Sequence, residues 1–98
     1  MATRTLSTTA EEVLPRNRLR KSWVIQNEDA SISVFLKQER VATPTVSSTD
    51  HDHALAAGSS LALSTLVDGA EQIEDRWTAV AASGTPRISF FQTETVVR

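Results

Sequence analysis

The sequence predicts a small all-β domain, an antiparallel β-sandwich or barrel of about six strands with an extended N-terminal arm. Three observations support this class. Apolar and polar residues alternate with period two in several short segments, as in half-buried strands. Turn residues separate these segments at short intervals. No segment has the longer period of an amphipathic helix. The 98 residues suffice for one domain, which we divide into an arm, residues 1–18, and a β domain, residues 19–98.

The arm is predicted from its composition. Residues 1–14 are rich in Thr and Ser and follow neither the helical nor the strand period. Pro15 favours an extended conformation of Leu14. A segment of this composition has too few apolar residues to pack by itself. We therefore expect it to extend away from the β domain.

The β domain begins with a predicted hairpin. Residues 19–27 place Trp23 and Ile25 on one side of a strand, and residues 31–38 alternate cleanly. The short polar stretch between them has the length of a hairpin turn. Residues 42–54 then form a polar loop that is longer than most connections.

The second half of the domain contains three further predicted strands. Gly58 suits a turn before a strand with Leu61 and Leu63, and Asp68-Gly69 is a turn dipeptide followed by an acidic stretch compatible with one helical turn. The remaining elements are a strand at 77–82, a tight turn at 83–85 and a final strand at 87–97.

Composition excludes several classes of function. Ten basic and twelve acidic residues give a formal charge of −2, which does not favour binding to nucleic acid. There is no cysteine and hence no disulfide. No apolar run has the length of a signal-peptide core or of a membrane span. We expect a soluble protein without export signal.

No residues form a recognisable catalytic or cofactor site. The chain has no cysteine nucleophile, no Gly-x-Ser-x-Gly motif and no glycine-rich phosphate loop. The carboxylate pairs Glu11-Glu12 and Glu74-Asp75 are expected on a surface with twelve acidic residues. We predict that the protein is not an enzyme and uses no cofactor.

The segment Asp50-His51-Asp52-His53 is the one cluster with metal-ligand chemistry. Its two histidines are two residues apart and would project to the same side of an extended chain. A structural zinc site needs four ligands, and no cysteine or third histidine is present. We favour a solvated loop, with metal binding or pH sensing as alternatives, and assign no metal ligand.

Basic and aromatic residues allow two interpretations each. Arg16, Arg18, Arg20 and Lys21 suit either a solvated strand edge or a docking patch for an acidic neighbour. Trp77 is expected in the core, with carbohydrate stacking or subunit contact as the alternative. Adjacent residues of a strand face opposite ways, so one of Phe90 and Phe91 is expected to point away from the core, where a partner would cover it.

Three segments together resemble small virion proteins of tailed bacteriophages. Residues 20–27, RKSWVIQN, resemble their opening R-x-S-hydrophobic-x-I-x-N strand. Residues 55–63, LAAGSSLAL, resemble their L-x-x-G-x-x-L-x-L segment. Residues 77–85, WTAVAASGT, resemble the strand and turn that precede their last strand. The segments occur in the expected order.

This resemblance implies a capsid decoration (cement) protein on the exterior of a virion, made in the host cytoplasm. Such proteins bind the major capsid protein or other virion subunits and are often trimers at local three-fold positions. The alternative is a head-fibre, neck or tail component that binds a host surface or a carbohydrate. We expect the arm, at most about 60 Å long when extended, to bridge capsid subunits. The expected contact residues are Arg4, Leu6, Val13, Leu14, Arg16, Arg18 and Arg20.

Overall fold

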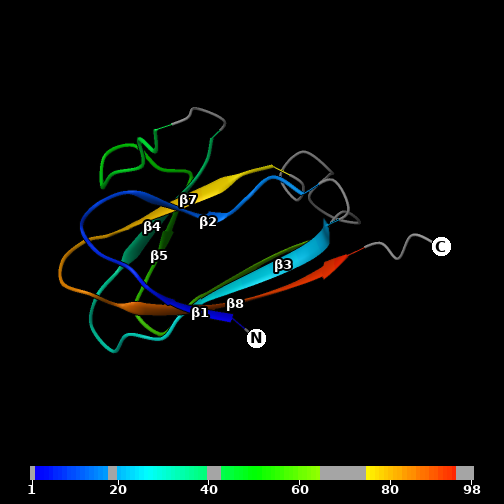
Figure 1. Cartoon of the computed structure of the whole chain (residues 1–98). Coiled ribbons are helices and arrows are strands. Elements are labelled where there is room, and N and C mark those ends of the chain that lie inside the picture. The colour runs from blue at the N-terminus through cyan, green and yellow to red at the C-terminus, as the bar shows by residue number, and fades with distance from the viewer. Residues whose placement is uncertain (1, 18–19, 40–42, 65–74, 95–98) are drawn as a thin grey trace.

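The computed structural model describes residues 2–17, 20–39, 43–64 and 75–94, which form two four-stranded antiparallel sheets (Figure 1). The all-β sandwich expected from the sequence is confirmed. The described part of the chain has eight strands where about six were expected. The two additional strands lie in the segment that was expected to be an arm. The strands are β1 (Ala2–Thr5), β2 (Glu11–Leu14), β3 (Arg20–Asn27), β4 (Val34–Gln38), β5 (His53–Leu55), β6 (Ser60–Ser64), β7 (Trp77–Ala81) and β8 (Arg87–Glu94).

The strand order is that of a jelly roll. We call the sheet with the order β1-β8-β3-β6 sheet A and the sheet with the order β2-β7-β4-β5 sheet B. Strand β1 pairs with β8, β2 with β7, β3 with β6 and β4 with β5, as in one long hairpin. Rolling this hairpin brings β8 beside β3 and β7 beside β4, which completes the two sheets.

The N-terminal segment belongs to the sandwich, so the expected boundary at residue 18 is wrong. Arg4 lies opposite Ile88 in sheet A, and the Leu6 N–H donates to the Pro86 carbonyl at 2.8 Å. The chain then crosses to sheet B, where Glu11 lies opposite Ala79. Each of the two strands has four residues, and a bulge interrupts the second, so neither has a readable period.

The expected hairpin between residues 19–27 and 31–38 is also wrong, because β3 lies in sheet A and β4 in sheet B. The connection is built on Asn27, which is fully buried. Its Nδ2 donates to the carbonyls of Ile32 at 2.7 Å and Leu55 at 3.1 Å. Asp29 accepts the N–H groups of Ser31 and Ile32, and these bonds lower its pKa. The polar stretch therefore directs the chain across the sandwich.

The core lies between the sheets around two tryptophans. Trp23 of β3 and Trp77 of β7 are both buried, with ring centroids 5.0 Å apart and ring planes at 63°. Trp77 is 1 % exposed, so its expected place in the core is confirmed and its alternative role in surface stacking is wrong. The predicted turns hold at Gly58 and Gly84, where φ is 74° and 59°. The predicted Asp68-Gly69 turn and the acidic helical turn lie outside the described residues, apart from Asp75.

Candidate functional site

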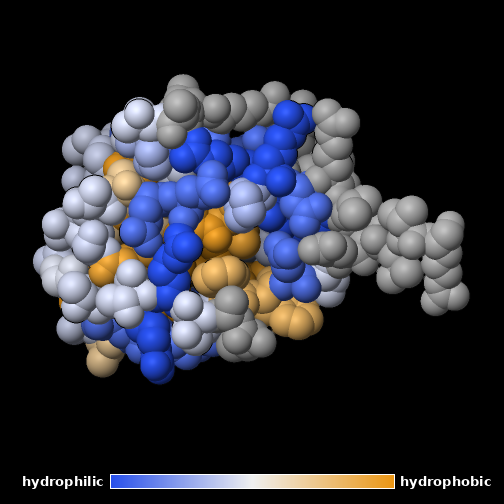
Figure 2. Space-filling view, in the orientation of Figure 1, coloured by the Kyte–Doolittle hydropathy of each residue, from blue (hydrophilic) through white to orange (hydrophobic). Residues whose placement is uncertain are grey.

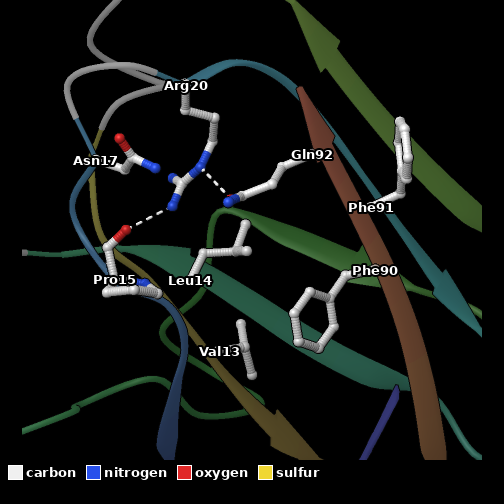
Figure 3. A pocket seen from close by; sticks show the side chains of 8 residues that line it. All are labelled: Val13, Leu14, Pro15, Asn17, Arg20, Phe90, Phe91 and Gln92. Carbon is white, nitrogen blue, oxygen red and sulfur yellow. Dashed lines mark hydrogen bonds between the residues drawn. The ribbon is translucent and has the colours of Figure 1, made fainter. Parts of the chain in front are cut away.

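A cleft opens between the two sheets, where the end of β2 faces the C-terminal half of β8. Its volume is about 340 Å³. Figure 3 shows Phe90 pointing into the cleft, towards Val13 and Leu14, while Phe91 points to the other face of β8. In the same orientation as Figure 1, the space-filling view shows apolar side chains between the sheets, framed by hydrophilic ones (Figure 2). The divergence expected for Phe90 and Phe91 is therefore confirmed.

Arg20 forms the polar end of this cleft and is 2 % exposed. Its Nε donates to Gln92 Oε1 at 2.8 Å, and its two other guanidinium nitrogens donate to the carbonyls of Pro15 at 2.6 Å and Asp75 at 3.2 Å. One cation thus connects β3 with β8, with the residue after β2 and with the segment before β7. Arg20 is a structural cross-link in this fold, and its burial leaves little of the side chain exposed for the expected contact with a partner.

The other expected contact residues also belong largely to the interior of the fold. Leu6, Val13 and Leu14 are buried in the core and cannot contact a partner while the sandwich is intact. Arg4 is at the surface, where it bonds to the Glu12 carbonyl and lies 3.7 Å from the Glu11 carboxylate. Arg16 is exposed, and Arg18 lies outside the described residues.

The outer face of sheet A has no charge across its centre. Val24 is 36 % exposed and Phe91 is 50 % exposed, and they lie opposite each other on β3 and β8. A hollow of about 180 Å³ adjoins both and extends to Gln26. The backbone register places uncharged residues around them. We call this set the uncharged face: Thr3, Ser22, Val24, Gln26, Ser60, Ala62, Ser89, Phe91 and Thr93.

The polar groups of the uncharged face are only partly satisfied within the chain. The hydroxyls of Ser22 and Thr93 lie 2.6 Å apart and bond to each other. Ser89 is buried between Thr3 of β1 and Gln26 of β3, which lie opposite it on the two neighbouring strands. Its Oγ has no hydrogen-bond partner. A buried hydroxyl without a partner is uncommon in native proteins. The face therefore combines exposed apolar groups with a hydroxyl beneath its surface that has no hydrogen-bond partner.

The outer face of sheet B, in contrast, is covered by residues 43–52. Val46 of this segment is buried, and the His51 ring lies 4.8 Å from the Phe35 ring on β4. The Asp52 N–H donates to the Leu36 carbonyl at 2.8 Å, and its carboxylate accepts the Gln38 N–H at 2.8 Å. The segment read as a solvated loop thus forms a lid on the second sheet.

This arrangement separates the side chains of the candidate metal cluster, Asp50-His51-Asp52-His53, from one another. Asp50 pairs with Lys37 Nζ at 2.7 Å, and this bond raises the pKa of Lys37. His51 packs on Phe35 on the outer side of sheet B, whereas the His53 ring lies 5.8 Å from that of Trp77 in the core. The expected projection of both histidines to one side is wrong, because the chain turns at Asp52 to join β5. The described residues contain no group of three or more metal-ligating side chains placed for a metal ion.

The Glu39 carboxylate holds the first residues of the lid by hydrogen bonds, and it makes the stability of the fold depend on pH. It accepts hydrogen bonds from Thr45 N at 2.8 Å and from Thr45 Oγ1 at 2.6 Å, and Thr78 Oγ1 donates to it at 3.0 Å. Burial raises the pKa of Glu39, but these bonds and Lys37 Nζ, 3.6 Å away, outweigh it and lower the pKa below its ordinary value of 4.5.

We therefore expect Glu39→Gln to lower the melting temperature at neutral pH and not at low pH. A carboxyl group with a lowered pKa in the folded chain stabilises it fully above 4.5, and the contribution is lost as the pH falls through the folded-state pKa. Melting curves of both proteins from about pH 7 to about pH 3 measure the difference. A difference in melting temperature that is constant over this range would contradict the assignment.

Comparison with known proteins found no matching family model, no curated protein and no solved structure of significant similarity. No helix within the described ranges is long and apolar enough to cross a membrane. A function must therefore be argued from the surfaces themselves. Sequence reasoning named Phe91 as one of two candidates for an outward aromatic, and it missed Val24 and Gln26 as its neighbours. The alternation of residues 19–27, which places Val24 and Gln26 on the side opposite to Trp23 and Ile25, was the available signal.

Proposed function

We propose that this chain is a structural protein of a tailed-phage virion, a capsid decoration protein that binds the assembled shell through the uncharged face. The observation that carries the proposal is the exposure of Phe91 and Val24 in the uncharged face, at the centre of the outer side of sheet A. Cores of protein interfaces are enriched in aromatic residues and depleted of charges. Side chains such as Phe91 are the anchors on which such interfaces depend.

Two further considerations support the proposal. The resemblance to virion proteins covers residues 20–27, 55–63 and 77–85, and these segments supply β3, β6 and β7 of the sandwich. The jelly roll is an architecture that viral capsid and lectin domains use, although a fold alone does not determine a function. In this form of the proposal, the sheet replaces the N-terminal segment as the contact surface, because residues 2–14 are built into the sandwich.

The proposed mechanism is stabilisation by mass action. A protein that binds the assembled lattice and not the free subunits shifts the equilibrium towards the lattice. Contacts made by the uncharged face would be weakly dependent on salt, because no charge at its centre is screened by ions. Major capsid protein or another virion subunit is the proposed partner.

We expect Phe91→Lys to reduce binding to capsids of the encoding phage by about 30-fold or more, as for a truncated interface anchor. The side chain is half exposed, so the melting temperature should change little. Co-sedimentation of purified capsids with increasing amounts of each protein measures occupancy.

Phe35→Ala is the matched control for this experiment. It removes the same ring from the outer face of sheet B, where His51 covers it, so capsid occupancy should be retained. Wild-type occupancy by Phe91→Lys would exclude the uncharged face as the capsid contact.

The second candidate is a carbohydrate-binding module of a fibre or tail. It is favoured by one observation, the exposed Phe91 ring among hydroxyl and amide side chains, which suits stacking of a sugar with hydrogen bonds around it. Binding to a glycan array that is lost in Phe91→Ala, without binding to capsids, would establish this function instead.

A further inference from the structure

Strand β6 is an edge strand of sheet A, and within the described residues it lacks the usual protection against pairing. The other end of sheet A is β1, which carries Arg4. In sheet B the edges are β2, which has Glu11, Glu12, a bulge and a following Pro15, and β5, which has only three residues. Charges, bulges, prolines and short length are the devices by which edge strands avoid other chains. Strand β6 has five uncharged residues in regular register with β3 and has none of these devices.

The direction of the β6 backbone groups follows from its pairing with β3. The Asn27 N–H donates to the Ser59 carbonyl at 2.9 Å, and Gln26 lies opposite Ser60. In an antiparallel pair, hydrogen-bonded and non-hydrogen-bonded residue pairs alternate. The backbone of Leu61 and Leu63 therefore bonds to β3. The N–H and C=O groups of Ser60, Ala62 and Ser64 point away from it, towards the open edge.

The sequence of β6 is a palindrome, Ser-Leu-Ala-Leu-Ser, centred on Ala62. In an antiparallel pair of two such strands about a two-fold axis, Ala62 meets Ala62, and each Leu61 lies opposite Leu63 of the other copy. Each Ser60 lies opposite Ser64 of the other copy. Such a surface is complementary to itself, as a two-fold contact between identical subunits requires. No like charges meet, because the strand has none.

We propose that two copies of this chain pair through their β6 strands about a two-fold axis at Ala62. The four-stranded sheets A of both copies then form one continuous sheet. The outward groups of Ser60, Ala62 and Ser64 supply the hydrogen bonds, and Leu61, which is half-buried in the single chain, gains a leucine neighbour across the junction. This is β-augmentation with the same strand on both sides.

The pairing is independent of the proposed function and compatible with it. The uncharged faces of the two copies lie on the same side of the joined sheet, since strands of one sheet share its faces. A dimer would therefore present two such faces to one surface, and simultaneous binding raises the apparent affinity without new contacts. The three-fold arrangement expected from the resemblance is a different assembly, which the same experiment distinguishes.

The test is sedimentation velocity of the full chain over a series of concentrations, for the wild type and two variants. Ala62→Lys places two ammonium groups side by side at the axis, and we expect the dissociation constant to rise about tenfold or more, with partial recovery in high salt. Ala62→Pro removes an N–H that points away from β3, so the strand should survive while the dimer is lost. Ala82→Lys, an exposed alanine after β7, is the matched control.

The proposal is supported by a wild-type dimer that both Ala62 variants convert to monomer while Ala82→Lys stays dimeric. Circular dichroism spectra must remain those of the wild type, and if Ala62→Pro unfolds, Ala62→Lys and its salt dependence carry the test. A wild type that is monomeric at every concentration, a trimer, or a dimer unaffected by Ala62→Lys would overturn it. Phe91→Lys should leave the dimer intact, so failure of this pairing is distinguishable from failure of capsid binding.

Discussion

Trp77→Ala is expected to lower the free energy of unfolding by about 3–5 kcal/mol, the cost of truncating a large buried aromatic side chain. The ring fills the space between the sheets and contacts the Trp23 ring edge to face at 5.0 Å. Because a domain of this size has a total stability of about 5–15 kcal/mol, the variant should be largely unfolded at moderate denaturant concentration.

Urea denaturation followed by circular dichroism measures this effect. Trp77→Phe keeps an aromatic ring at the site and should lose distinctly less stability than Trp77→Ala. A double-mutant cycle with Trp23→Phe should give a coupling energy of about 0.5–1.5 kcal/mol, the value of an aromatic pair beyond its buried area. A loss below about 1 kcal/mol for Trp77→Ala would show that the ring does not hold the sheets together.

Arg20→Met is expected to cost about 2–4 kcal/mol of folding stability, since it removes hydrogen bonds to a charged group and leaves buried acceptors without donors. Methionine preserves most of the side-chain volume, so the lost guanidinium bonds dominate. The acceptors affected are Gln92 Oε1 and the carbonyls of Pro15 and Asp75. Thermal and urea denaturation measure the loss.

Arg16→Met is the control, because Arg16 is exposed and its replacement should change stability by no more than about 0.5 kcal/mol. Capsid occupancy of the folded fraction of Arg20→Met should equal that of the wild type. If Arg20→Met instead had the stability of the wild type but did not bind capsids, Arg20 would be a contact residue.

Local alternation predicted much of the sandwich. It placed Trp23 and Ile25 on one side of a strand, and it separated Phe90 from Phe91, because side-chain direction in a strand depends only on neighbouring residues. It could not predict which strands pair. A period-two pattern is the same for two strands of one hairpin and for two strands in opposite sheets, so β3 and β4 were joined wrongly.

The N-terminal strands and the candidate site depended on contacts between distant segments. Leu6 and Val13 show no period, and their burial is determined by β7 and β8 at the other end of the chain. From the sequence alone, Arg20 is interpreted as a surface charge. Its burial depends on Pro15, Asp75 and Gln92, which the fold places around its guanidinium group. The uncharged face likewise exists only when β1, β8, β3 and β6 lie side by side.

The pairing of β1 with β8 and of β2 with β7 has a consequence for biosynthesis. Residues 2–14 are translated well before β7 and β8, the strands that hold them. The sandwich therefore cannot close before β8 has been translated, and folding is slow because strands far apart in the sequence must pair. Until then the nascent chain exposes the apolar residues of the core, and this interval is when it is most vulnerable to aggregation and to proteases.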